Sequence, residues 1–143
     1  MEPLERLVYV SSAVQPVSDA QLLHLLERAR LRNKRCHVTG LLLFDAGNFM
    51  QYIEGPRSGL SEVYGHIKQD PMHTGLIELC LERANHRAFS DWAMAARVFE
   101  PGGQVRNVAS DADQCFNFNS LSAAHGSAGI LLQGFWQRSQ RLL

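Results

Sequence analysis

Two polar side chains of this sequence fall where short apolar segments should point into a protein core. Gln51 alternates with Phe49 and Ile53, so in a strand these three side chains face the same way. Tyr9 alternates with Leu7 in another β-prone segment and should reach the same core. A glutamine amide has donors and acceptors to satisfy, and the Tyr9 hydroxyl is an obvious partner. Such a pair can be structural, or its amide, which both accepts and donates, can pass on a proton from the tyrosine.

A third polar residue interrupts an apolar helical stripe. Leu22, Leu26 and Ala29 have the spacing of one helix face, and Asn33 lies on that face, about 20° from Leu22 at 100° per residue. One interpretation is a C-terminal cap, a role that Asn often takes. The other is a buried amide that hydrogen-bonds a ligand, because an unpaired buried amide costs about 1–3 kcal/mol.

Basic residues surround this asparagine. Around the helix axis, Arg30 and Arg32 flank Asn33 on either side of the apolar stripe. They belong to a cluster of cations near the expected end of the helix, which also contains Arg28, Lys34 and Arg35. Cations at a helix C-terminus are favoured by the helix dipole and are usually solvated. They can equally provide counter-charges for a phosphate-bearing ligand whose polar ring contacts Asn33.

The segments that must position these residues alternate between strand-like and helix-like patterns. The sequence predicts strand 7–10, a helix from 18, strands 38–44 and 49–54, helix 58–69, and strands 76–82 and 92–99. Ser18 and Gln21 have the spacing of a capping box, and residues 45–48 have the composition of a hairpin turn. This order predicts an α+β, ferredoxin-like βαββαββ fold, with a mixed five-stranded sheet and two helices on one face.

Alternation also assigns faces in the last two strands. Ile77, Leu79 and Leu81 are expected to share one face of their strand. Trp92 and Met94 should face the core that holds the tyrosine–glutamine pair. Met94 on its own would be read as ordinary core filler.

A Pro-Gly-Gly turn divides the chain into a domain of residues 1–100 and a C-terminal segment of residues 101–143. The second segment is poor in charge and rich in apolar and aromatic side chains, and Leu131, Leu132 and Phe135 have helical spacing. We expect one or two helices there, which cap the sheet face that the other helices leave bare and serve as an output segment.

Composition and charge exclude several classes of function. Fourteen Lys and Arg balance fourteen Asp and Glu, so the chain lacks the basic footprint of a nucleic-acid binder. No apolar run approaches the roughly 18–20 residues of a membrane helix, and the acidic N-terminus is not a signal peptide. The three cysteines and six histidines form no metal-ligand motif. We therefore expect a cytoplasmic protein with no metal site and no membrane or nucleic-acid partner.

Together these segments resemble the BLUF domain, a family of blue-light sensors that use FAD. The resemblance covers about residues 5–99 and rests on five stretches. They are Leu-Val-Tyr-Val-Ser at 7–11, Ala-Arg-Leu-Arg-Asn at 29–33, Val-Thr-Gly-Leu-Leu at 38–42, Phe-Met-Gln-Tyr-Ile-Glu-Gly-Pro at 49–56, and Asp-Trp-Ala-Met at 91–94. Their combination at these intervals is highly specific. Ser12 stands where many members have Arg, and Val38 stands where Ile is commoner.

The resemblance implies that FAD binds noncovalently with its ring between the two helices. Tyr9 and Gln51 would be the photoactive pair, and Trp92 or Met94 would line the site. The cofactor contacts that it implies are Tyr9, Arg30, Arg32, Asn33, Gln51, His73 and Met94. In the family mechanism, the tyrosine supplies an electron and then a proton through the glutamine. The rearranged glutamine amide then hydrogen-bonds the flavin differently and shifts its absorption to the red.

The resemblance is to the short, stand-alone members of the family, which have no attached effector domain. It therefore implies a sensor and not an enzyme, with output through a downstream effector protein in trans or through a homo-oligomer. A small flavin-dependent enzyme or a non-photoactive flavin-binding module is the alternative, although Tyr9 and Gln51 provide no obvious base.

An RNA-binding module and an acylphosphatase-like hydrolase share the topology. The sequence has neither the basic surface of the first nor the glycine-rich phosphate loop of the second.

Overall fold

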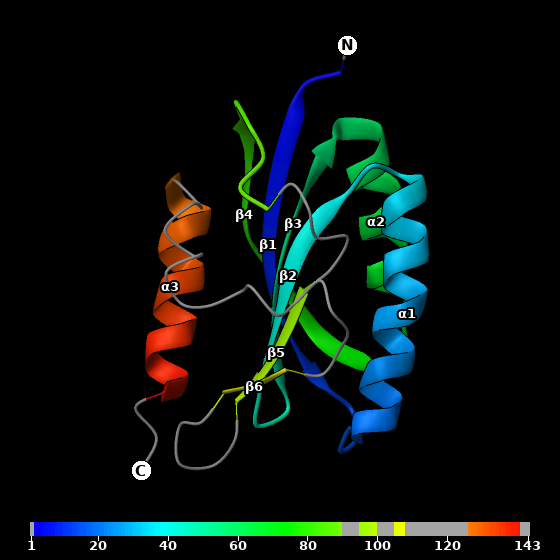
Figure 1. Cartoon of the computed structure of the whole chain (residues 1–143), viewed down its shortest axis with the longest axis vertical. Helices are drawn as coiled ribbons and strands as arrows, with labels where there is room; N and C mark the ends of the chain where they lie inside the picture. The colour runs from blue at the N-terminus through cyan, green and yellow to red at the C-terminus, as the bar shows by residue number, and fades with distance from the viewer. Residues whose placement is uncertain (1, 90–94, 100–104, 108–125, 141–143) are drawn as a thin grey trace.

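A six-stranded mixed sheet separates two layers of helices (Figure 1). The structure is a computed structural model that describes residues 2–89, 95–99, 105–107 and 126–140. Its elements are β1 (Leu4–Ala13), α1 (Asp19–Arg35), β2 (Thr39–Asp45), β3 (Asn48–Pro56), α2 (Arg57–Gln69), β4 (His73–Ala84), β5 (Ala95–Phe99), β6 (Val105–Asn107) and α3 (Gly126–Gln140). The α1 and α2 helices cover one face of the sheet and α3 covers the other (Figure 1).

The sheet order is β4-β1-β3-β2-β5-β6. The β2 and β5 strands are parallel, and the other neighbouring pairs are antiparallel. This arrangement confirms the predicted ferredoxin-like fold with its five mixed strands. The short β6 strand was not predicted, because three residues are too few for alternation to reveal a strand.

Local sequence signals set the ends of the elements around the site. The Ser18 hydroxyl accepts a hydrogen bond from the Gln21 N–H at 3.1 Å, and the Gln21 side chain accepts one from the Ser18 N–H at 2.9 Å. The predicted capping box is therefore confirmed. Between β2 and β3, Ala46 and Gly47 both have positive φ, 49° and 83°. Two such residues form the kind of turn that suits the twist of a tight hairpin.

Each face of the sheet has its own apolar core. On one face, strand residues such as Leu7 and Ile53 pack against α1 and α2. On the other, Val8, Met50 and Tyr52 pack against α3 residues that include Leu132 and Trp136. The expected C-terminal helix over the second face is thus confirmed. Gly59 at the start of α2 permits a close approach of the two helices, since a Cβ there would lie 2.1 Å from the Cys36 carbonyl oxygen at the end of α1.

The edge strand β4 does not keep the alternation that its sequence predicts. Leu81 pairs with Leu7, and Ile77 pairs with Val10. Leu7 belongs to the core under α1 and α2, whereas Val10 packs in the core under α3. A register shift lies between these pairs, so Ile77 and Leu81 are on opposite faces and the predicted shared face is wrong. A bulge adds a residue to one strand and reverses the alternation beyond it.

None of the helices in the described residues combines the length and the apolar character that a membrane crossing requires.

Replacing Leu132 by Ala tests whether α3 contributes to the folded core. Leu132 is fully buried, so the variant should lose about 2–5 kcal/mol of unfolding free energy. The matched control is Ile130→Ala on the same helix, where the side chain is 73% exposed and the change should stay within about 0.5 kcal/mol. Urea denaturation followed by circular dichroism measures both. Equal midpoints for the two variants would show that α3 does not stabilise the sheet.

Candidate functional site

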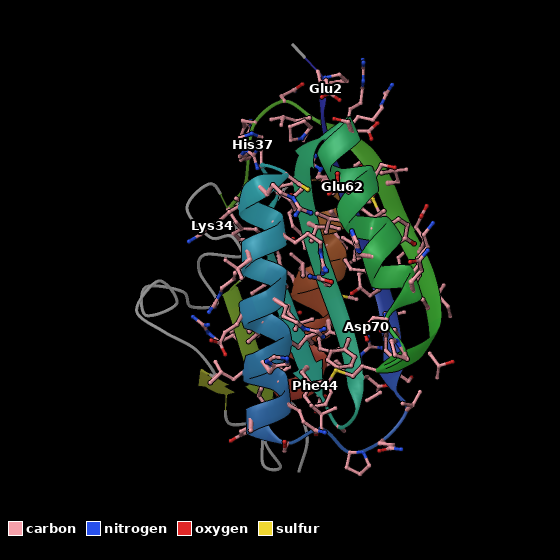
Figure 2. All side chains as sticks on the ribbon, turned by 90° about the vertical axis from the view of Figure 1, so that its right-hand side faces the viewer. Glu2, Lys34, His37, Phe44, Glu62 and Asp70 are labelled. Atoms are coloured by element: carbon pink, nitrogen blue, oxygen red, sulfur yellow. The ribbon has the colours of Figure 1, made fainter. Side chains whose placement is uncertain are left out.

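A pocket opens between α1, α2 and the sheet and brings together five of the residues singled out by the sequence. It is lined by Tyr9 on β1, Gln51 on β3, Arg32 and Asn33 on α1, and His73 at the start of β4. The space is about 540 Å³, counted with the part open to solvent, and its remaining walls are mostly aliphatic and aromatic. Figure 2 shows α1 and α2 side by side in front of the sheet, which gives the pocket its two helical walls.

Tyr9 and Gln51 meet directly across the sheet. They are paired neighbours in the antiparallel β1–β3 register, and the Tyr9 hydroxyl donates a hydrogen bond to the Gln51 side-chain oxygen. Both residues are buried. Burial raises the pKa of Tyr9 far above its ordinary value, so the phenol stays protonated and acts as a donor.

Asn33 is a buried helix residue and not a cap. The α1 helix continues through Arg35 and has Cys36 at its C-cap, whereas the Asn33 side chain lines the pocket. Its backbone carbonyl accepts a hydrogen bond from the Val38 N–H at 2.8 Å, which fixes the turn into β2. Of the two interpretations of Asn33, the structure excludes the capping role.

The two flanking arginines differ in position. Arg32 lines the pocket, and its Nε is buried without a hydrogen-bond partner in the part of the chain that the structure describes. Arg30 is not among the residues that line the pocket. A buried guanidinium N–H that lacks an acceptor is costly, so a ligand with acceptor atoms would stabilise Arg32 there.

His73 is held in place by two hydrogen bonds. Its Nε2 lies 2.7 Å from the Ile67 carbonyl oxygen and its Nδ1 lies 2.7 Å from the Ser11 hydroxyl. Because a carbonyl can only accept, Nε2 must carry a proton, and in the neutral ring Nδ1 accepts from Ser11. The Asp70 carboxylate accepts a bond from the Met72 N–H at 2.9 Å and shapes the chain between α2 and this histidine.

The family to which this chain belongs is identified by comparison with known proteins. The family described as "Sensors of blue-light using FAD", BLUF, matches residues 4–95. The chain belongs to the BLUF family.

Several BLUF relatives resemble this chain. The photoactivated adenylate cyclase subunit beta of Euglena longa is 33% identical over 98 residues, which are 68% of this chain but 11% of that protein. The blue light- and temperature-regulated antirepressor BluF of Escherichia coli K12 is 33% identical over 91 residues, which are 64% of this chain and 23% of that protein. This chain therefore spans a small part of the length of these relatives.

Solved BLUF structures share the fold. The dark-state structure of BlrB superposes with a TM-score of 0.66 at 34% identity, covering 69% of this chain and 75% of that chain. The photo-activated state of BlsA gives the same TM-score over 98% of this chain and 96% of that one. Its 19% identity shows a common fold only.

The pocket fits the flavin that the BLUF family is described as using. A flavin ring has a broad apolar surface and, at one end, carbonyl and ring-nitrogen acceptors. The pocket provides apolar walls between two helices, amides from Asn33 and Gln51, and the buried Nε of Arg32. Trp92 and Met94, which were also predicted to line the site, lie outside the described residues.

A buried carboxylate that sequence reasoning missed anchors the chain leading toward residues 90–94. Glu54 on β3 is fully buried and accepts hydrogen bonds from the Tyr52 hydroxyl at 2.9 Å, the Ala88 N–H at 3.0 Å and the Phe89 N–H at 2.7 Å. The sequence does contain a signal for this residue, because a glutamate alternates there with apolar Met50 and Tyr52 in a buried strand.

In the described parts of the chain, no three His, Cys, Asp or Glu side chains gather as metal ligands would.

The raised pKa of Tyr9 predicts a pH-dependent stability. Above about pH 10 Tyr9 ionises in the unfolded chain and stays protonated in the folded one, so the unfolded state binds fewer protons and the unfolding free energy falls with pH. One such group contributes a slope of about 1.4 kcal/mol per pH unit. Urea denaturation of wild type and Tyr9→Phe between pH 9 and 11 should show that slope reduced in the variant. Parallel pH curves would contradict the assignment.

Proposed function

We propose that this chain is a blue-light sensor that binds FAD noncovalently in the pocket between α1 and α2. The observation that carries the proposal is the buried hydrogen bond from Tyr9 to Gln51 in the wall of that pocket. A bound flavin supplies blue-light absorption and an excited state that can oxidise a nearby phenol.

Tyr9 and Gln51 form the switch in this proposal. Tyr9 keeps its proton in the dark because burial disfavours the phenolate, and it gives up an electron and then the proton when it is oxidised. The Gln51 amide is the partner of that hydroxyl and can both accept and donate. Once Tyr9 has regained its proton and electron, the Gln51 amide is left in a rearranged hydrogen-bonding state, which is the signal.

The other pocket residues hold the cofactor. Asn33 provides a buried amide and Arg32 a buried guanidinium N–H toward the ring. His73 closes the pocket from the start of β4, positioned by Ser11 and the Ile67 carbonyl. Trp92 and Met94 keep the role predicted for them from the sequence, next to the flavin.

The hydrogen bonds of His73 and the protonation of Tyr9 favour a sensor over a flavin enzyme. Both ring nitrogens of His73 are hydrogen-bonded within the protein, and burial keeps Tyr9 protonated. Neither residue is therefore available as a general base toward a substrate. The relatives with cyclase activity in their names are far longer than the part that this chain matches.

The output must be amplified outside the pocket. One neutral hydrogen bond is worth about 0.5–1.5 kcal/mol, enough to bias a two-state element by roughly 2- to 12-fold. We infer a downstream effector protein in trans or a change in a homo-oligomer as the amplifier, with residues 101–143 as the output segment. The relatives named as a light-regulated cyclase and a blue-light-regulated antirepressor support coupling of this domain to an effector.

The cytoplasm remains the predicted location of the protein.

Two conservative variants test the switch itself. Tyr9→Phe removes only the hydroxyl, and Gln51→Leu removes the amide at similar volume. Purified wild type should be yellow and show a reversible red shift of flavin absorption under blue light, whereas both variants should bind flavin without that shift. Tyr64→Phe is the control, because Tyr64 lies next to Tyr9, with ring centroids 6.1 Å apart, and does not line the pocket. A wild-type-like shift in Tyr9→Phe or Gln51→Leu would remove that residue from the switch.

The Asn33→Ala variant tests cofactor holding apart from photochemistry. Loss of a buried amide contact should weaken flavin binding by about 1–3 kcal/mol, or roughly 5- to 150-fold, while the fold is kept. Titration of the apoprotein with FAD, followed by fluorescence, measures the dissociation constant. Asn48→Ala at the exposed β2–β3 turn should bind like wild type. Unchanged affinity in Asn33→Ala would assign Asn33 a structural role only.

A further inference from the structure

The buried carboxylate of Glu54 joins three segments that are separate in the sequence. On its own strand, β3, it accepts a hydrogen bond from the Tyr52 hydroxyl at 2.9 Å. Two successive backbone N–H groups beyond β4 also donate to it, Ala88 at 3.0 Å and Phe89 at 2.7 Å. The Thr39 hydroxyl at the start of β2 donates at 3.5 Å. A carboxylate can accept all four bonds on its two oxygens, whereas the amide of a glutamine has a single acceptor oxygen.

Arg87 attaches the same stretch of chain to the end of α1. Its guanidinium donates to the Thr39 hydroxyl at 3.0 Å, to the Glu54 backbone carbonyl at 3.3 Å and to the His37 carbonyl at 2.6 Å. Figure 2 shows His37 next to the C-terminal end of α1. Residues 87–89, named here the 87–89 clip, are therefore bonded to β2, to β3 and to the turn that follows α1.

The clip is one side chain away from the switch pair. Gln51 accepts a hydrogen bond from Tyr9, and the next residue of β3, Tyr52, donates to Glu54 on the opposite face of the sheet. Coupling between two places in a protein travels through such chains of hydrogen bonds and packed side chains. The contacts of Glu54 are satisfied while Gln51 accepts from Tyr9, so a displacement of β3 away from this arrangement weakens them.

Resting on the proposed function, we propose that Glu54 is a positioning residue of the light switch, which couples the state of the Gln51 amide to the 87–89 clip through Tyr52. The rearranged Gln51 amide loosens the clip, and the closed clip in turn favours the dark arrangement of Gln51, because coupling between two sites is reciprocal. The chain leaves the clip directly into residues 90–94, which include Trp92 and Met94.

Amide hydrogen exchange of Ala88 and Phe89 reads the clip independently of flavin absorption. It is measured by nuclear magnetic resonance on the flavin-loaded protein, in the dark and under blue light. Wild type should protect both amides in the dark and exchange them faster under light. Glu54→Gln replaces one acceptor oxygen by an NH₂ donor, so at least one of the two amides should exchange roughly 10- to 150-fold faster in the dark. Dark recovery of the flavin absorption should become roughly two- to tenfold slower, since the closed clip no longer favours the return.

Tyr52→Phe separates coupling from a purely structural role. It removes only the hydroxyl and keeps the ring that packs edge-on against Phe89, with centroids 5.2 Å apart. Glu54 keeps its bonds to Ala88 and Phe89, so their dark protection should remain. The light-induced increase in exchange should disappear, and recovery should slow as in Glu54→Gln. If Glu54→Gln does not fold, Tyr52→Phe decides alone.

Glu62→Gln on α2 is the matched control. Its carboxylate accepts from Arg35 at 2.9 Å and lies outside both the pocket and the clip. Exchange of Ala88 and Phe89 and the dark recovery should both be those of wild type. The same effects in Glu62→Gln as in Glu54→Gln would overturn the proposal, because they would not depend on the clip.

The remaining outcomes distinguish this coupling from the proposed function. If wild type shows the red shift but Ala88 and Phe89 exchange equally in dark and light, the coupling is wrong and the sensor proposal stands. The same holds if Tyr52→Phe keeps the light-induced increase, or if Glu54→Gln recovers at the wild-type rate. If wild type shows no red shift, the proposed function fails and the coupling fails with it.

Discussion

Tyr9 and Gln51 share a buried hydrogen bond, and the β1–β3 pairing and the wall of the pocket are arranged around it. Neither side chain suits an apolar core unless its polar atoms are paired, and burying an unpaired one costs about 1–3 kcal/mol. The bond therefore requires β1 and β3 to keep the register that places the two residues opposite each other. A glutamine amide also has more hydrogen-bonding capacity than one phenol can satisfy. The pocket lies directly beside the pair, and both residues line it.

The β3 strand connects this pair to the opposite face of the sheet. Gln51 faces the pocket, and the next residue, Tyr52, faces the α3 core and donates a hydrogen bond to Glu54. On the same face, Glu82 of β4 accepts from Arg6 at 2.9 Å and from the Ala128 N–H near the start of α3 at 3.4 Å. A shift of the β1–β3 backbone thus has direct contacts through which to reach α3. These contacts give physical content to the proposal that the C-terminal segment carries the output.

Sequence patterns predicted what depends on local periodicity and capping. The alternation around Tyr9 and Gln51, the capping box at Ser18 and the apolar face of α3 all appear where they were expected. The β4 bulge was missed because alternation within one strand carries no information about the register of its neighbour. The contacts of Glu54 with Ala88 and Phe89 were missed because they join segments more than 30 residues apart. For the same reason, the sequence alone could not distinguish Arg32, which lines the pocket, from Arg30, which does not.

In the proposed mechanism, light rearranges the hydrogen bonds of the Gln51 side chain. The most direct measurement is the nuclear magnetic resonance of its side-chain amide in the flavin-loaded, 15N-labelled protein, assigned by the signals that disappear in Gln51→Leu. With this mechanism, these signals shift under blue light and return in the dark at the rate at which the flavin absorption recovers. Gln51 amide signals that stay in place while the absorption changes would contradict it.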